Sequence, residues 1–528
     1  MSSLRALRAR NLRSFHSGSE YVDINDVNVL VGKNSCGKST FARLFPLLRQ
    51  SIEENTKGPI LWFGDYVDFG DFSSSLNSKA EPGNEEIFFD FDLDLNVVVD
   101  RHNQALPEFP PEFDVSVIGG RSVDFRARVS LGVKEEYQKT VTSYVSISID
   151  GIDIEIEFGD SEVKKFSAKI DSLGKFVEFG GNYMSVDSDF LPRLYVPLKK
   201  ARSPGHSFSD KPSTFEEIKK RFAEFVRSYH HQNKSIHNVM CAIQTLRMSD
   251  EKGVFEHLRK EFKGDKKFRK FVEEDKKVFS KISFMYFLSM NINALMVSVN
   301  KVVRDFSSSV RYLGPIRSTA ERFYRYQDLQ VKEVDHSGSN LSMVINSLSD
   351  AKKSSLRTWM NTHFGFGLEL KSEGYHYALS IKEDGSDIAY NISDMGFGYS
   401  QILPIVVSIW LEAEKEEGLD FWGRVEESVI VIEQPELHLH PELQKRFAYA
   451  ISKIVSMNNK KRIRFVLETH SKHMIDAFGE AIRSNVVSDE KINIVIFEKL
   501  FDGFTKTSAS GFDDEGYLMN WPVGFLSA

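Results

Sequence analysis

The chain has 528 residues, of which 41% are hydrophobic and 27% charged, and a formal net charge of −7, so it is composed like a globular protein with one large domain or several smaller ones. These values exclude a disordered, collagen-like or disulfide-scaffolded chain, and a surface that attracts nucleic acid over its whole extent. The two cysteines, Cys36 and Cys241, are expected to be free thiols in a reducing compartment, and no apolar run approaches the roughly 20 residues of a membrane-spanning helix, so we expect a soluble, cytoplasmic protein that does not enter a membrane.

The first predicted elements surround a glycine-containing loop. Residues 4–15 alternate apolar and polar side chains as a half-buried strand does, and the apolar strand 27–31 runs directly into Gly32. Over residues 38–50 the apolar side chains recur at helical spacing, and Pro46 is expected to bend this helix. The predicted order is therefore strand, glycine loop and helix.

The loop from Gly32 to Ser39 matches the pattern Gly-x4-Gly-Lys-Ser/Thr of a phosphate-binding P-loop. Its glycines let successive backbone N–H groups and the helix N-terminus face phosphate oxygens, Lys38 neutralises the β- and γ-phosphates, and the Ser39 hydroxyl coordinates Mg2+. The alternative, a chance glycine turn, does not explain why the motif lies between a strand and a helix. We therefore predict ATP and Mg2+ as cofactors, with the nucleotide contacted by Gly32, Lys33, Asn34, Ser35, Cys36, Gly37, Lys38, Ser39 and Thr40.

Two segments of different character follow. Residues 86–200 contain period-two segments separated by Gly, Asn and Asp turns, which predicts an antiparallel, β-rich insertion. Residues 201–310 have helical periodicity, beginning where Ser213 or Thr214 can cap a first turn, which predicts a helical insertion. The mixed charges of residues 259–281 favour a solvated helix face, with a surface for phosphate or for a partner protein as the alternative.

After about residue 365 strands and helices alternate again, as in a mostly parallel sheet covered by helices. The apolar strand 428–432 ends at Glu433, and a carboxylate at the end of a strand next to the P-loop strand is expected to be the Walker B acid that holds the Mg2+ water shell. We therefore expect Ser39 and Glu433 to share the metal. His438 and His440 follow, and because no further Cys or His lies nearby, a structural loop is favoured over a metal site.

A second strand ends in a polar residue farther along the chain. The residues from Arg464 to Ser471 form a strand followed at once by His470, and this placement in a P-loop protein favours a γ-phosphate sensor over an ordinary turn residue. Between the two halves of the sequence, residues 393–401 form a glycine-containing turn ahead of the apolar helix 402–411. By itself this turn indicates no function.

Taken in this order, the P-loop, the turn 393–401, the strand that ends at Glu433 and the histidine His470 resemble the motifs of ABC-type ATPases of the SMC/RecF branch. The segments around Glu433 and His470 look most like those of stand-alone ATPases related to the OLD family. The resemblance implies an α/β fold in which residues 1–85 and 311–528 form a split ATPase head around the two insertions.

The same resemblance assigns further roles. Residues 396–401 would form a degenerate signature loop, residues 436–440 would lie in the D-loop, and residues 311–317 would return the chain to the head after the insertions. Gln50 is a candidate Q-loop residue, although a glutamine on a helix is more often a surface residue. The nucleotide contacts that the resemblance adds are Arg13, Gly398, Ser400 and Gln401.

Two features depart from the family pattern. OLD-type proteins end in a Toprim nuclease with an acidic metal cluster, whereas about 58 residues follow His470 in this chain, and we expect no nuclease among them. The position that usually holds the catalytic glutamate is Gln434, an amide that cannot take a proton from water, so hydrolysis is expected to be slow unless Glu436 or His470 acts as the base. The predicted catalytic residues are Glu433, Gln434, Glu436 and His470.

The resemblance implies an ATPase that dimerises head to tail around ATP, as a homodimer or a higher even-numbered assembly, and that regulates a separately encoded effector nuclease in antiphage defence. The similar PtuA subunits of Septu and retron-linked systems act with an HNH nuclease, which we favour over the Toprim partner of PARIS systems. In the retron-linked case a reverse transcriptase with its nucleic acid is a further partner. Two alternatives stay open: a RecF/SMC-like repair ATPase that grips DNA, and a self-contained nuclease with its site in residues 86–310.

Overall fold

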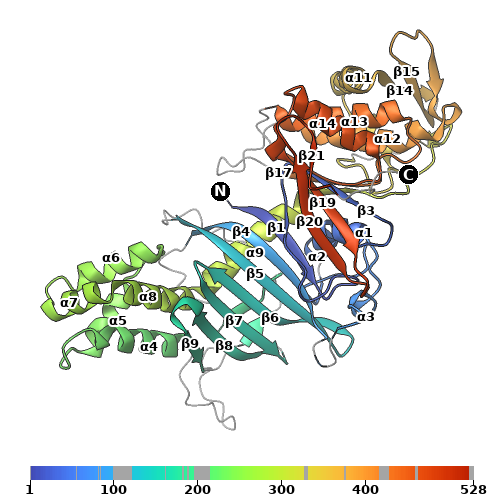
Figure 1. Ribbon diagram of the computed structural model, residues 1–528. Coiled ribbons are helices and arrows are strands. Elements are labelled where there is room, and N and C mark those ends of the chain that lie inside the picture. Colours follow the sequence, from blue (N-terminus) through green and yellow to red (C-terminus); the bar gives the residue numbers. More distant parts are fainter. Residues whose placement is uncertain are drawn as a thin grey trace. The chain divides into compact units, whose positions relative to one another are not determined.

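The computed structural model divides the chain into two compact units (Figure 1). The insertion unit comprises Met1–Arg10, Glu54–Leu61 and Ala80–Asp305, and the head unit comprises Asn11–Glu53, Trp62–Lys79 and Phe306–Ala528. The structure describes residues 2–54, 56–80, 83, 85–98, 122–160, 162–180, 184–186, 190–195, 214–325, 331–373, 376–415, 427–457 and 462–521. The predicted boundary between residues 200 and 201, and the capping residue Ser213, lie outside these ranges.

A mostly parallel sheet forms the centre of the head unit. Its strand order is β12 (Val310–Leu313), β17 (Glu427–Glu433), β18 (Arg462–Glu468), β3 (Val27–Gly32), β19 (Ile492–Lys499), β20 (Thr505–Phe512) and β21 (Leu518–Met519). The first five strands are parallel, and β20 and β21 add antiparallel pairs at one edge. Every residue of β3 is buried, because both faces of a sheet of this kind are covered. The predicted α/β class is confirmed.

Helices and a small second sheet complete the head unit. The helices are α1 (Lys38–Ala42), α2 (Leu44–Glu53), α3 (Phe72–Ser75), α10 (Leu341–Ser347), α11 (Asp350–Phe364), α12 (Phe397–Ala413), α13 (Pro441–Ser456) and α14 (Lys472–Arg483). The antiparallel strands β13 (Tyr324–Arg325), β14 (Phe366–Glu373), β15 (His376–Glu383) and β16 (Ala389–Asn391) form the second sheet, and β2 (Val22–Asp23) precedes β3. The helix after the P-loop is interrupted at Arg43, because the ring of Pro46 clashes with the carbonyl group four residues before it and Pro46 has no N–H to donate.

The insertion unit is an antiparallel sheet with helices, as the sequence predicts for this stretch. In sequence order its strands are β1 (Ser3–Arg10), β4 (Ile87–Val98), β5 (Ser122–Glu136), β6 (Lys139–Ile149), β7 (Ile152–Gly159), β8 (Glu162–Ile170), β9 (Lys175–Phe179), β10 (Met184–Val186) and β11 (Arg193–Tyr195). Its helices are α4 (Thr214–Ser228), α5 (Ile236–Gln244), α6 (Glu251–Glu261), α7 (Lys266–Glu274), α8 (Lys276–Met290) and α9 (Ile292–Ser308). Strand β1 pairs along β4, which explains why residues 3–10 group with this unit although the predicted boundary placed residues 1–85 in the head.

The charged stretch 259–281 is distributed over three helices, α6, α7 and α8. Its charges pair locally, with 3.3 Å from Arg259 Nη2 to Glu273 Oε1 and 3.0 Å from Lys281 Nζ to Glu251 Oε2, as expected for a solvated helix face. Within the described ranges, no single helix combines the length and hydropathy needed to cross a bilayer, although α8 and α9, which are bent by 69° relative to each other, satisfy both criteria as a pair.

Candidate functional site

The loop between β3 and α1 has a backbone that its glycines make possible. Gly37 has a φ of 102°, a left-handed conformation, and a Cβ atom there would lie 2.7 Å from Thr505 Oγ1. Thr505 Oγ1 in turn donates a hydrogen bond to the Cys36 carbonyl oxygen (2.9 Å) and lies 2.7 Å from Ser14 Oγ. These contacts hold the P-loop against Thr505 at the start of β20 and against Ser14.

An open cavity of about 280 Å³ lies over this loop. It is lined by Ser14, Asn34, Ser35, Gly37, Lys38, Ser39, Thr40, Gln434, Glu468 and His470. The buried Lys38 Nζ donates hydrogen bonds to the carbonyl oxygens of Gly32 (3.0 Å) and Lys33 (2.8 Å), and the thiol of Cys36 donates to the Lys33 carbonyl oxygen (2.8 Å). Six of the nine predicted P-loop contacts therefore line the cavity, whereas Gly32, Lys33 and Cys36 are not among its lining residues.

A carboxylate other than the predicted one lies beside Ser39. Glu468 ends β18, the strand next to β3, and its Oε1 accepts a hydrogen bond from Ser39 Oγ (2.8 Å). The side chain is 2% exposed, and burial together with the nearby carboxylate of Glu433 raises the pKa of Glu468 to about 7. The expectation that the Glu433 strand adjoins the P-loop strand is wrong, because β18 lies between β17 and β3.

The Glu433 carboxylate forms its hydrogen bonds with Arg43 and Tyr312. Arg43 grips its carboxylate through two hydrogen bonds, Nε to Oε1 (2.7 Å) and Nη2 to Oε2 (2.8 Å), and the Tyr312 hydroxyl donates to Oε1 (2.7 Å). Burial and the Glu433 charge raise the pKa of the Tyr312 hydroxyl well above its usual range, so it stays a donor. Glu433 does not belong to the cavity lining, and its predicted role at the metal stays a prediction.

The other predicted catalytic residues divide between the cavity and the protein interior. Gln434 lines the cavity with a left-handed backbone (φ 46°), which its N–H group fixes by donating to the Glu468 carbonyl oxygen (2.8 Å). His470 also lines it, and burial next to Lys38 lowers the pKa of its imidazole, which favours the neutral ring at pH 7. Glu436 is outside the lining, and its Oε1 accepts from the His470 N–H group (2.7 Å). Burial raises the pKa of Glu436.

The predicted signature residues do not contribute to this chain's own P-loop cavity. Ser400 and Gln401 are buried in the first turns of α12, where Gln401 Nε2 donates to the Arg317 carbonyl oxygen (3.3 Å). A Cβ atom on Gly398 would lie 2.8 Å from the carbonyl oxygen of His438, so this turn packs against the loop after β17. Arg13 stacks its guanidinium on Phe69, with 4.3 Å from Cζ to the ring centroid.

Two further expectations have clear outcomes. Gln50 is 1% exposed, so the expectation of a surface residue is wrong. Its Oε1 accepts from the Val67 N–H group (3.1 Å) and its Nε2 donates to the Val67 carbonyl oxygen (3.2 Å), which ties α2 to the following loop. His440 caps α13 by accepting from the Glu442 N–H group (3.3 Å), a structural role of the kind predicted for this loop. No cluster of three metal-ligating side chains occurs within the described part of the chain.

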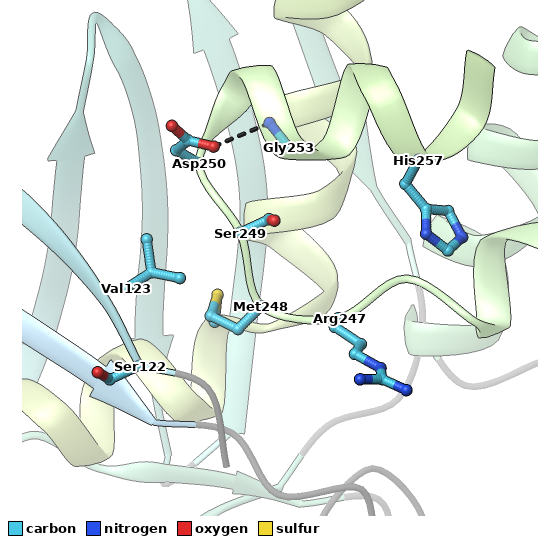
Figure 2. Close-up of a pocket in the computed structure, with 8 residues that line it drawn as sticks. All are labelled: Ser122, Val123, Arg247, Met248, Ser249, Asp250, Gly253 and His257. Atoms are coloured by element: carbon cyan, nitrogen blue, oxygen red, sulfur yellow. Dashed lines mark hydrogen bonds between the residues drawn. The ribbon is translucent and has the colours of Figure 1, made fainter. Parts of the chain in front are cut away.

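A larger cavity of about 450 Å³ lies in the insertion unit, between the start of β5 and the start of α6 (Figure 2). Figure 2 shows the Asp250 carboxylate turned to the Gly253 N–H group, from which it accepts a hydrogen bond (2.8 Å) as the cap of α6. His257 Nε2 lies 3.0 Å from the Thr245 hydroxyl. The Asp250 carboxylate caps a helix and the His257 imidazole pairs with a hydroxyl, so among the described residues that line this cavity no group of side chains resembles the P-loop site.

Comparison with known proteins shows the family of the chain. The sequence profile of a family described as "AAA ATPase domain" matches residues 3–475. The chain belongs to the AAA ATPase domain family. The match spans the P-loop, both insertions, Glu433 and His470, so ATP binding and ATPase chemistry are family properties of this chain. No protein of curated function matches the sequence.

Among solved structures, SMC head domains match over nearly the whole chain at low similarity. The head from Pyrococcus furiosus, bound to the C-terminal domain of ScpA, has 11% identity, 96% coverage of both chains and a TM-score of 0.35. The head from Thermotoga maritima has 11% identity, coverage of 96% of this chain and 98% of that one, and a TM-score of 0.31. The head from Pyrococcus yayanosii has 8% identity, 98% coverage of both and a TM-score of 0.36. Likenesses this distant carry no argument about function.

Sequence reasoning missed several residues at or next to the site, namely Arg43, Tyr312, Glu468 and Thr505. For Glu468 a signal was present, because it ends an apolar strand just as Glu433 does. For Arg43 and Tyr312 no local pattern distinguishes them from ordinary helix and strand residues, since their partner lies far away in the sequence.

Proposed function

We propose that this chain is a slow ATPase in which two copies close around ATP, and that its nucleotide state regulates a separately encoded effector nuclease in antiphage defence. The observation that carries the proposal is the P-loop cavity, in which Lys38, Ser39, Gln434, Glu468 and His470 converge. Stand-alone ATPases with similar motifs act with an HNH nuclease, which is why an effector of that kind is proposed here ahead of a Toprim nuclease.

The residues of the cavity fit a nucleoside triphosphate with Mg2+. Lys38 is buried and donates hydrogen bonds to two carbonyl oxygens of its own loop. Hydrogen bonds from its ammonium group to charged phosphate oxygens would be stronger. Glu468 Oε2 is buried and has no hydrogen-bond partner among the described residues. A bound divalent cation would supply the positive charge that this carboxylate oxygen lacks. Bound Mg2+ would supply charge stabilisation at the transferred phosphate.

Slow hydrolysis follows from the identity of residue 434. Gln434 lines the cavity at the sequence position where related ATPases usually have the catalytic glutamate. Its amide can orient a water molecule by hydrogen bonding but cannot accept a proton from it. His470, with its neutral ring, senses or polarises the terminal phosphate. A slow enzyme suits a regulator, because the ATP-loaded state then persists until a trigger opens the two heads.

The proposed pairing of two copies rests on α12. Its first residues do not line the chain's own P-loop cavity, and among the described residues no side chain caps its N-terminus. Gly396 precedes the helix with open space around its Cβ position, so the free N–H groups and the positive end of the helix dipole are accessible to phosphate of a second copy.

Mixing two defective variants tests this composite site. Lys38→Ala disables the P-loop, and Gly396→Glu adds a negative charge at the α12 N-terminus in a position where its own fold has room for a side chain. Sedimentation with ATP should show each variant alone as a monomer, and the mixture as a heterodimer with one intact site. A mixture that stays monomeric while the wild type dimerises would refute the sandwich. Ser354→Arg, at an exposed position on α11, is the control and should leave dimerisation intact.

Regulation of an effector is tested separately. The chain should be co-expressed with nuclease genes from its genomic neighbourhood, and the purified complex assayed for DNA cleavage with ATP, with ADP and without nucleotide. Cleavage that depends on the nucleotide and on the partner supports the proposal. Salt-sensitive DNA binding by the pure chain without any partner would favour the repair ATPase, and metal-dependent cleavage by the pure chain would favour a self-contained nuclease.

A further inference from the structure

Gln434, which lines the P-loop cavity directly after β17, has an unusual backbone conformation. Its φ is 46°, in the left-handed region that residues other than glycine adopt rarely and at a cost in free energy. A residue keeps such a conformation only where its surroundings fix it. The contacts around Gln434 therefore determine the direction in which its side chain leaves the backbone.

The peptide unit between Glu433 and Gln434 is held at both of its polar groups. Its N–H group, which belongs to Gln434, donates a hydrogen bond to the Glu468 carbonyl oxygen (2.8 Å). Its carbonyl oxygen, which belongs to Glu433, accepts a hydrogen bond from Arg317 Nη2 (2.8 Å). Because the φ angle of Gln434 describes rotation about the bond next to this peptide unit, the two hydrogen bonds restrict where the rest of residue 434 can lie.

The loop that follows β12 places Arg317 for this contact. The N–H groups of Gly314 and Ser318, on either side of Arg317, each donate to a backbone carbonyl oxygen (2.9 and 2.8 Å). The carbonyl oxygen of Arg317 accepts a hydrogen bond from Gln401 Nε2 on α12 (3.3 Å). The guanidinium group therefore extends from an anchored backbone.

The Arg317 side chain makes few contacts for a buried charge. The residue is 3% exposed, and its Nε and Nη1 atoms have no hydrogen-bond partner among the described residues. Burial lowers the pKa of the guanidinium to about 10, and the charges of Glu436 and Glu433 oppose this shift, so the group is a cation at pH 7. Burying a cation with incomplete hydrogen bonding costs free energy, which is typical of a group that serves function rather than stability.

We propose that Arg317 is a positioning residue for ATP hydrolysis, whose guanidinium holds the Glu433 carbonyl oxygen and so keeps Gln434 in the conformation that directs its amide at the attacking water. The inference rests on the proposed function, since it concerns how residue 434 orients water at the ATP site. Arg317 does not line the cavity, so it acts through Gln434 and not on the nucleotide. Arginine and lysine are not interchangeable where two parallel hydrogen bonds are needed, but here one donor atom makes the contact, so lysine can replace it.

The test separates turnover from binding in the full-length chain. Steady-state phosphate release and the affinity for a non-hydrolysable ATP analogue are measured for the wild type, Arg317→Met, Arg317→Gln, Arg317→Lys and Arg325→Met. Arg317→Met should lower kcat by about 10- to 100-fold through misplacement of residue 434, and should keep the wild-type affinity, which also shows that it is folded. Arg317→Gln, whose amide is too short to reach Glu433, should show the same loss, and Arg317→Lys should recover most of the rate. Arg325, an exposed arginine on β13, is the matched control, and Arg325→Met should behave as the wild type does.

A double-mutant cycle adds a readout that a merely structural role would not produce. Gln434→Ala should lower kcat, and adding Arg317→Met should lower it no further, because Arg317 acts only through the side chain of residue 434. An unchanged kcat in Arg317→Met or in Gln434→Ala, additive losses in the double variant, equal losses of kcat and affinity, or no recovery in Arg317→Lys would overturn the inference. A wild type that binds the analogue but releases no phosphate from ATP would refute the proposed ATPase itself, and the role of Arg317 with it.

Discussion

The buried acid at the P-loop predicts an unusual dependence of stability on pH. Glu468 is 2% exposed, and burial with the repulsion from Glu433 raises its pKa from 4.5 to about 7. An acid whose pKa is raised on folding stabilises the folded state most at low pH, and this contribution is lost as the pH rises through the folded pKa, because the unfolded chain releases the proton first. Replacement by glutamine preserves the shape of the protonated acid and cannot ionise.

The magnitude follows from the two pKa values. A difference of about 2.5 pKa units corresponds to roughly 3 kcal/mol, at about 1.36 kcal/mol per unit, and about 2.4 kcal/mol of this lies between pH 5 and pH 7.5. In EDTA, Glu468→Gln should therefore gain about 2.4 kcal/mol of stability relative to wild type between these two pH values. Acids elsewhere in the protein titrate equally in both proteins and cancel from the difference.

The assay is urea unfolding followed by tryptophan fluorescence. The five tryptophans all fall within the residue ranges of the head unit, so the signal reports on the unit that contains Glu468. They are Trp62, Trp359, Trp410, Trp422 and Trp521. A difference between variant and wild type that stays constant from pH 5 to pH 7.5 would refute the reasoning, because it would mean that Glu468 ionises as freely in the folded protein as in the unfolded chain.

Three other predictions concern the same unit. Lys38→Ala should abolish ATP binding in calorimetry, whereas Lys33→Ala, at an exposed position outside the cavity lining, should not; equal affinities for both variants would contradict the assignment. Gln434→Glu should speed steady-state phosphate release by up to about 10² to 10⁴-fold, and a rate unchanged from wild type would mean that no water lies within reach of residue 434. Gln50→Ala should cost about 1 to 3 kcal/mol in urea unfolding, because it leaves the buried backbone N–H group of Val67 without its acceptor, whereas the Val67 carbonyl oxygen keeps the Gly64 N–H group as a donor; a loss below about 0.5 kcal/mol would show that the Val67 N–H group finds another partner.

Local sequence determined the elements that depend on neighbouring residues. The P-loop motif was recognisable because the left-handed turn at Gly37, the ammonium of Lys38 and the hydroxyl of Ser39 lie on one contiguous stretch of backbone. The antiparallel insertion was predictable because side chains alternate between the two faces of a strand, as they do along β4, where Phe89 and Phe91 are buried in the apolar core and the intervening Asp90 pairs with an arginine.

Tertiary structure alone decided which of these elements are neighbours. An apolar run predicts a strand that is buried on both faces, but it does not predict which strand lies beside it. Parallel strands are joined by long crossover connections, so strands that are consecutive in the sequence need not be neighbours in the sheet. Because β18 lies between β3 and β17, Glu468 contacts Ser39 and Glu433 contacts Arg43. Both glutamates end an apolar strand, so the sequence alone does not show which of them lies beside Ser39. Gln50 is buried for a similar reason, because its partner Val67 belongs to a loop whose path is set by packing rather than by local periodicity.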